Sequence, residues 1–139
     1  MTALQLTMFN LAVSWALAVL IWMVQAIVYP GFRRIPAEGF VDYHRWYVAR
    51  ISLIVTPLMF AEAVLTVMWL SIAGTPAAMI SAALVLVVWL STFLLQVPSH
   101  NRLKYGKDRV LIRRLVATNW IRTVAWSLKT LIVTLASIA

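Results

Sequence analysis

The 139-residue chain contains no cysteine and only four acidic residues. The missing thiols exclude disulfides, iron–sulfur clusters and thiolate metal sites. Charged residues make up 12% of the chain, well below the roughly one quarter that soluble domains carry. Positions 1–32 have no charged side chain, and none occurs between Glu62 and Arg102 or after Lys129. This distribution excludes an ordinary soluble domain.

Hydrophobic residues account for 63% of the chain and are grouped in long runs. A membrane-spanning helix needs about 20 predominantly apolar residues, and four stretches meet this requirement, at about 4–29, 48–73, 77–97 and 115–138. The first stretch lacks the basic leading region and the small-residue cleavage site of a signal peptide, so we expect a retained span. The sequence predicts one all-α domain over 1–139, a four-span transmembrane helix bundle.

The basic residues are concentrated after the first and third hydrophobic stretches. They are Arg33, Arg34, Arg45 and Arg50 in the first group, and Arg102, Lys104, Lys107, Arg109, Arg113 and Arg114 in the second. Lys and Arg favour the cytoplasmic side of a membrane, so we expect both connections inside, both termini outside, and a multi-pass protein of a bacterial inner membrane. The net charge of +8 is then explained by contact with anionic lipid headgroups, and no nucleic-acid partner is expected.

The chain is organised as two tandem helical hairpins. Each half runs to a proline, Pro30 or Pro98, with a polar residue before it, and re-enters through an amphipathic segment, 38–50 or 108–118. A continuous helix over 38–73 would be about 54 Å long, well beyond a hydrocarbon core of about 30 Å. We therefore expect helices two and four to extend into the cytoplasm.

One acidic and one basic side chain lie inside hydrophobic stretches. Glu62 and Lys129 are each 14 positions beyond the predicted span starts at 48 and 115, about 21 Å deep at the helical rise, so they can pair if the second and fourth spans are neighbours. Asn119, Arg122, Trp126 and Lys129 follow helical spacing and form one polar stripe. This pattern indicates either a proton or ion relay along the stripe or a buried ion pair that fixes the register of the helices.

The two histidines lie near the cytoplasmic rim, His44 in the entry of the second helix and His100 just after Pro98. Each is either a hydrogen-bonded interface residue or half of a two-histidine haem or metal site. Glu62 lies about 27 Å from His44 along a helix and cannot join such a site. Because no recognised ligand spacing appears, no metal site is predicted, and the cofactor stays unknown.

Several polar side chains are expected to converge within about 10 Å of the same rim. They are Gln25, Tyr29, Gln96, His100, Asn119 and Arg122, with His44 beside them. Amides, a phenol, imidazoles and a guanidinium are suited to bind a polar headgroup or the oxygenated end of a lipophilic small molecule whose apolar body lies between the spans. Alternatively, they hydrogen-bond one another across the helices, at roughly 0.6 kcal/mol each.

Three short patches carry a resemblance to a known family. The segments 28–36 (VYPGFRRIP), 96–103 (QVPSHNRL) and 119–123 (NWIRT) resemble, in order and spacing, the signature patches of the anthrone-oxygenase-like family of small four-helix membrane proteins, long described as a domain of unknown function. In that family the second patch usually reads Asn-Val-Pro-x-Asn, whereas this chain has Gln96 and His100 at the two asparagine positions. This departure leaves the substrate open.

The resemblance implies a four-helix membrane fold and, for a few members, oxidation of anthrones to anthraquinones. That reaction needs a base for an acidic C–H proton and a cationic or hydrogen-bonding group for the resulting enolate, which then reacts with dioxygen. By position, His100 would be the base, since the ordinary pKa of histidine lies near neutrality. Arg122 and Asn119 would hold the oxyanion. The expected enzyme is a cofactor-independent, oxygenase-like oxidoreductase.

A second hypothesis assigns the chain no catalytic role. It would then be an accessory subunit that packs against a membrane-protein partner, or against further copies of itself as a homo-oligomer, and contributes helices and a basic cytoplasmic surface. A transporter is a third hypothesis, but a single small bundle would need oligomerisation to build a translocation path.

Overall fold

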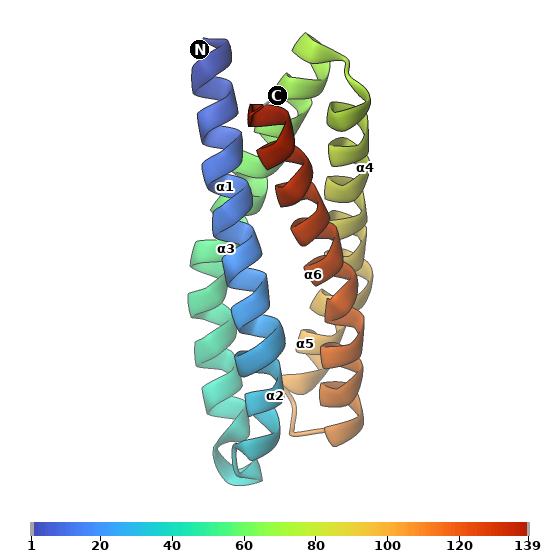
Figure 1. Cartoon of the computed structure of the whole chain (residues 1–139). Helices are drawn as coiled ribbons and strands as arrows, with labels where there is room; N and C mark the ends of the chain where they lie inside the picture. The colour runs from blue at the N-terminus through green and yellow to red at the C-terminus, as the bar shows by residue number, and fades with distance from the viewer. Residues whose placement is uncertain (1, 139) are drawn as a thin grey trace.

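Each hydrophobic stretch forms a long helix in the computed structural model, which describes residues 2–138 (Figure 1). The first helix, Ala3–Arg34, comprises α1 (Ala3–Met23), a π-helical turn η1 (Val24–Val28), α2 (Tyr29–Gly31) and a 3-10 turn η2 (Phe32–Arg34). The second is α3 (Ala37–Ala73). The third, Pro76–Leu103, comprises α4 (Pro76–Ser91), a second π-helical turn η3 (Thr92–Gln96) and α5 (Val97–Leu103), and the fourth is α6 (Arg109–Ile138). The described residues contain no strand, so the predicted all-α class is confirmed.

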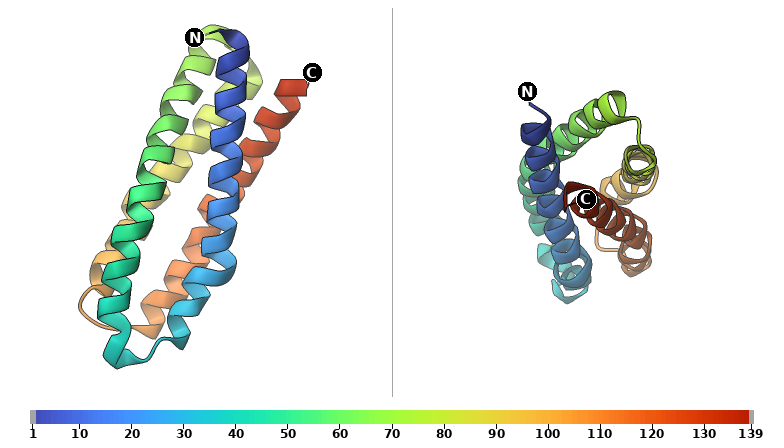
Figure 2. Two further views of the ribbon diagram at one scale, coloured as in Figure 1. Left: turned by 90° about the vertical axis from the view of Figure 1, so that its left-hand side faces the viewer. Right: turned by 45° about the horizontal axis from the view of Figure 1, so that its top comes forward.

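The helices alternate in direction, and the two ends of the chain lie at the same end of the bundle (Figures 1 and 2). Consecutive helices pack side by side, and α6 closes the ring by packing against both α1 and α4. In this arrangement α3 and α6 lie diagonally opposite each other. With 37 residues, α3 is about 55 Å long at 1.5 Å per residue, which agrees with the predicted extension beyond the membrane core.

The turn between α3 and α4 contains the signals that end one helix and begin the next. Gly74 has φ 59°, and its N–H donates to the carbonyl of Leu70 at 3.0 Å, a C-terminal geometry that glycine adopts without steric cost. Thr75 then caps α4 by accepting from the N–H of Ala78 at 3.3 Å, and Pro76 occupies the first turn. The hairpin is therefore fixed by three adjacent residues.

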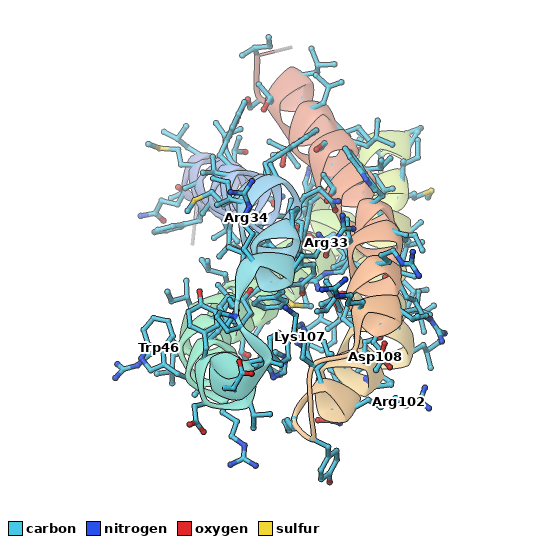
Figure 3. The ribbon with its side chains drawn as sticks, turned by 90° about the horizontal axis from the view of Figure 1, so that it is seen from below. Arg33, Arg34, Trp46, Arg102, Lys107 and Asp108 are labelled. Carbon is cyan, nitrogen blue, oxygen red and sulfur yellow. The ribbon has the colours of Figure 1, made fainter. Side chains whose placement is uncertain are left out.

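The two basic connections meet at the opposite end of the bundle, seen from below in Figure 3. Asp108 caps α6, because its Oδ1 accepts from the N–H groups of Val110 and Leu111 at 2.7 and 3.1 Å. Lys107 Nζ donates to the carbonyl oxygens of Arg33, at 3.0 Å, and Ile35. The second connection thus binds the carbonyls that the end of the first helix leaves free.

The first and third helices continue beyond the prolines at which the predicted spans end. The N–H of Tyr29 donates to the carbonyl of Val24, and the N–H of Val97 donates to that of Thr92, five residues back in each case. Each π-helical turn is separated by one residue from a proline, which has no N–H and crowds the preceding turn. The wider turn accommodates Pro30 and Pro98 without ending the helix, and its occurrence in both halves supports the predicted tandem repeat.

The surface of the bundle is apolar and its interior contains many polar groups. Large hydrophobic side chains are exposed along every long helix, with Leu53 at 72% and Phe93 at 57% as examples. The buried polar side chains are Asn10, Ser14, Gln25, His44, Glu62, Thr66, Ser81, Ser91, Gln96, Ser99, Asn119, Arg122, Thr123, Lys129 and Thr130. All four helices are long and apolar enough to cross a membrane. The chain is therefore a multi-pass integral membrane protein.

Candidate functional site

Gln25 connects the first π-helical turn to α6. Its Nε2 donates to the carbonyl of Val116 at 3.1 Å, and its Oε1 accepts from Asn119 Nδ2 at 2.9 Å and from Thr123 Oγ1 at 3.2 Å. All the hydrogen-bonding capacity of this amide except one N–H is directed at α6. Gln25 and Asn119, two of the predicted site residues, therefore bond each other between helices.

Gln96 is the counterpart of Gln25 in the second π-helical turn. Its Nε2 donates to Thr118 Oγ1 at 3.1 Å, whereas its buried Oε1 has no hydrogen-bond partner. The two glutamines thus hydrogen-bond to α6 from opposite sides, at positions two residues apart, Val116 and Thr118. Unlike Gln25, Gln96 also lines an internal cavity.

His44, His100 and Tyr29 form a hydrogen-bonded chain of three side chains. His44 Nε2 lies 2.9 Å from His100 Nδ1, and His100 Nε2 lies 3.0 Å from the hydroxyl of Tyr29. The imidazole of His44 is buried and stacks on Phe40 at 5.6 Å between ring centroids, and Phe32 packs edge-on against both histidines. The structure brings together the two histidines, which the sequence left unconnected.

The hydrogen-bonded chain of His44, His100 and Tyr29 ends at a cavity between α3 and the α4–α5 helix. The cavity has a volume of about 380 Å³, within the range typical of small-molecule sites. Its polar lining comprises Tyr29, Tyr47, Gln96, His100 and Arg122, together with Ser52, Thr56, Thr92 and Asn101. Apolar side chains, among them those of Leu20, Val24, Val55 and Met59, form the remaining wall. The predicted site residues Gln25, His44 and Asn119 do not line it.

The cavity is a cleft that opens sideways through the wall of the bundle. Its lining includes two rows of exposed residues at helical spacing: Ser52, Thr56 and Phe60 on α3, and Phe93, Val97 and Asn101 on η3 and α5. Aromatic rings stand at this opening, since the centroid of Trp89 lies 5.2 Å from that of Phe60 and 5.7 Å from that of Phe93. In a multi-pass protein such an opening faces lipid.

Arg122 places a positive charge at the polar end of the cleft. The side chain is buried, its Nε has no hydrogen-bond partner, and its guanidinium carbon lies 5.1 Å from the ring centroid of Trp126. Among the described residues no carboxylate lies within ion-pair distance of this guanidinium. Since buried charges are normally paired, Arg122 is a suitable partner for an anionic or carbonyl oxygen of a bound molecule.

Glu62 and Lys129 pair deep in the bundle. Lys129 Nζ lies 3.3 Å from Glu62 Oε1 and donates to Asn10 Oδ1 at 2.9 Å and Ser14 Oγ at 2.7 Å, while Trp126 Nε1 donates to Glu62 Oε2 at 2.7 Å. The pair spans the diagonal between α3 and α6, so the long side chains, and not adjacency of the two helices, bring the charges together. The ammonium group thus has two hydrogen-bond acceptors besides the carboxylate, and the carboxylate has one hydrogen-bond donor besides the ammonium group.

The polar stripe on α6 does not form a continuous path for protons. Between Arg122 and Glu62 it passes through Trp126, whose ring faces the guanidinium and whose N–H faces the carboxylate. An indole N–H is a donor only and does not take up or release protons in ordinary conditions. Of the two interpretations of the charge pair, this geometry favours the ion pair that fixes helix register over the relay.

The two histidines are arranged as a hydrogen-bonded pair. Their facing nitrogens are 2.9 Å apart, which is a hydrogen-bond distance and is shorter than the roughly 3.3 Å between two imidazole nitrogens that bind one tetrahedral zinc ion. Among residues 2–138, no group of three or more potential metal-ligating side chains is close enough to hold an ion. At this separation the two facing nitrogens can share a hydrogen bond and exchange a proton.

Comparison of the chain with protein-family models, with curated proteins and with solved structures found no match. The site is therefore interpreted from its own residues. Tyr47 and Phe32, which the sequence analysis did not select, belong to it: Tyr47 lines the cleft and packs 5.3 Å from Phe32 between ring centroids. The signal for Tyr47 was its position one helical turn after His44, on the same face.

Proposed function

We propose that this protein binds a lipophilic small molecule with an oxygenated polar end in the cleft between α3 and α4–α5. The observation that carries the proposal is the position of Arg122, a buried cation without a carboxylate partner at the polar end of a cavity whose wall is mostly apolar. A ligand oxygen beside Arg122 would compensate a charge that is costly to bury alone. The lateral opening supports entry from the bilayer, where a lipophilic molecule concentrates.

The cleft favours a flat, aromatic ligand. The rings of Phe60, Trp89 and Phe93 line its opening, and Tyr29 and Tyr47 stand near its polar end. Aromatic rings stack or pack edge-on with one another in proteins. A cavity of about 380 Å³ holds a molecule of a few fused rings, so a polycyclic phenol or ketone is the proposed ligand class.

The proposed reaction is a cofactor-independent oxidation of such a ligand, as the resemblance to the anthrone-oxygenase-like family implies. Loss of an acidic C–H proton gives an enolate, Arg122 holds the enolate oxygen, and dioxygen oxidises the electron-rich carbon; anthrone and dioxygen yield anthraquinone and water. The position of Arg122 at the cleft supports its assigned role. Asn119 bonds Gln25 and does not line the cleft. Gln96 lines the cleft, so its amide nitrogen would face the ligand oxygen in place of that of Asn119.

For orientation, we propose that the end with the two basic connections lies in the cytoplasm and contacts anionic headgroups. The clustering of basic residues at that one end (Figure 3) supports this assignment. The polar end of the cleft would then be close to the cytoplasmic surface.

The test of binding uses two tryptophan substitutions on the same helix. Val55 lines the cleft, whereas Leu53, two positions earlier, is 72% exposed on the lipid-facing side and does not line it. In detergent or nanodiscs, Val55→Trp is expected to abolish saturable binding of anthrone, measured by fluorescence, while Leu53→Trp retains it. Equal binding by the two variants would refute the cleft as the site. Absence of saturable binding by the wild-type protein, together with stably co-purifying subunits, would favour the accessory role.

A further inference from the structure

We infer that Tyr29 is the group that exchanges a proton with the bound molecule, and that His100 and His44 form a relay that carries this proton away from the cleft. The inference rests on the proposed function only in requiring a ligand with an acidic C–H or O–H. It assigns His100 a role different from that of a base in contact with the ligand, and it gives a role to His44, which does not line the cleft.

Both ring nitrogens of His100 are already engaged. Nε2 lies 3.0 Å from the Tyr29 hydroxyl, and Nδ1 lies 2.9 Å from His44 Nε2. A histidine that uses both nitrogens within the protein has none left for a ligand atom. The Tyr29 hydroxyl has one hydrogen and two lone pairs, of which the contact with His100 uses one position, and Tyr29 lines the cleft. Tyr29 is therefore the end of the chain that a ligand reaches.

The contact between the two imidazoles determines how protons are distributed along the chain. Only one hydrogen fits between His44 Nε2 and His100 Nδ1, so one nitrogen donates and the other accepts. When His100 Nδ1 carries that hydrogen, its Nε2 is free to accept from the Tyr29 hydroxyl. All three side chains are then aligned to pass a proton from Tyr29 toward His44.

The transfer is balanced without any change of oxidation state. As the ligand C–H or O–H bond breaks, its proton forms a new O–H bond with Tyr29. The original hydroxyl proton of Tyr29 moves to His100 Nε2, and the Nδ1 proton of His100 moves to His44 Nε2. The products are an anionic ligand beside Arg122 and a protonated His44.

His44 is the end of the chain that lies away from the cleft. Its Nδ1 is buried and has no hydrogen-bond partner in the described part of the chain, and its ring is stacked on Phe40, with 20° between the planes. The contact with His100 engages only Nε2 of His44, so this nitrogen is the one that receives the proton.

The first test does not depend on any ligand. Histidine side chains labelled with ¹⁵N are compared by NMR in the wild-type protein, in Tyr29→Phe and in Tyr43→Phe. Tyr43 is next to His44 in the sequence, is 41% exposed and lies outside the cleft, so it is a matched hydroxyl deletion. Tyr29→Phe is expected to shift the ring nitrogens of both histidines, although Tyr29 contacts only His100. Unchanged His44 resonances in Tyr29→Phe would overturn the relay.

The second test measures proton transfer itself. Anthrone bound to the protein in D₂O without oxygen is expected to exchange its acidic methylene hydrogens faster than free anthrone, as detected by mass spectrometry. Because general acid–base groups contribute at least about 100-fold, Tyr29→Phe and His44→Gln should each lose most of this acceleration while still binding anthrone. Wild-type exchange in either variant would contradict the relay. If wild-type protein binds no anthrone but its histidines remain coupled to Tyr29, the proposed ligand is wrong and the relay stands.

Discussion

Glu62 and Lys129 form an ion pair across the diagonal of the bundle, with Lys129 Nζ 3.3 Å from Glu62 Oε1 and neither side chain exposed by more than 1%. The pair joins α3 and α6, which lie diagonally opposite each other in the bundle. Trp126 donates to the carboxylate, and Asn10 and Ser14 accept from the ammonium group. An interaction of this kind selects one relative rotation of the helices and disfavours others.

Substitution of one member of this pair should lower the stability of the protein much more than substitution of both. Lys129→Met leaves the Glu62 carboxylate buried with only Trp126 as donor, and a destabilisation of about 3 kcal/mol or more is expected. The double variant Glu62→Leu/Lys129→Met has no orphaned charge and should recover most of this loss. Reversible unfolding in mixed detergent micelles measures the difference. A double variant as unstable as the single one would contradict the register role.

Substitution of Gln25 should mainly lower the stability of the bundle, whereas substitution of Gln96 should mainly weaken ligand binding. Gln25 makes three hydrogen bonds to α6, whereas Gln96 makes one and leaves Oε1 free at the cleft. At roughly 0.6 kcal/mol per interhelical hydrogen bond, Gln25→Leu is expected to destabilise the bundle by about 2 kcal/mol. Gln96→Leu should lower stability by less than half as much, but it should weaken the binding of anthrone. A reversed order of the two stabilities would refute the assignment.

Arg122 should contribute more to binding than to folding. Hydrogen bonds to a charged group contribute about 1.5–3 kcal/mol, so Arg122→Gln is expected to weaken anthrone binding at least about tenfold. Arg122→Lys keeps the charge but loses the planar donor geometry, and an intermediate loss is expected. Titration of the two variants in nanodiscs checks the order. Unchanged affinity in Arg122→Gln would show that the ligand oxygen does not lie beside this residue.

The cysteine-free sequence allows the membrane orientation to be tested directly. Single cysteines at Arg34 and Tyr105, in the two basic connections, and at Thr75, in the α3–α4 turn, all replace exposed residues. In intact cells a membrane-impermeant thiol reagent is expected to label Thr75→Cys and to leave Arg34→Cys and Tyr105→Cys unmodified until the membrane is opened. Labelling of the two basic connections from opposite sides would contradict the up-and-down topology.

Hydropathy was sufficient to predict the four helices, because each run of apolar residues is long enough to cross a membrane and is bounded by charged residues or a glycine turn. It also predicted the pairing of Glu62 and Lys129, since equal depth follows directly from residue number and helical rise. It did not show that this pair would span a diagonal. Helix adjacency depends on packing between residues far apart in sequence.

The site was less predictable because of the π-helical turns. A π-helical turn inserts one extra residue, which rotates all later residues by about 100° relative to a regular helix. Gln25 and Tyr29 are one turn apart by regular spacing, but Gln25 points to α6 and Tyr29 to His100. The prolines marked the places where this occurs, but not the direction of the side chains that follow.

The most direct test of lipophile binding in the cleft is photo-crosslinking with a diazirine-bearing anthrone, followed by peptide mapping. Saturable labelling is predicted at Tyr47, Val55 and Met59 of α3 and at Phe93, Gln96 and Val97 of the third helix, with excess unlabelled anthrone as competitor. Lipid-facing residues such as Leu53 and Leu94, on the same helical segments, serve as the internal control. Labelling that is not competed, and that is as strong at Leu53 and Leu94 as in the cleft, would contradict the proposal.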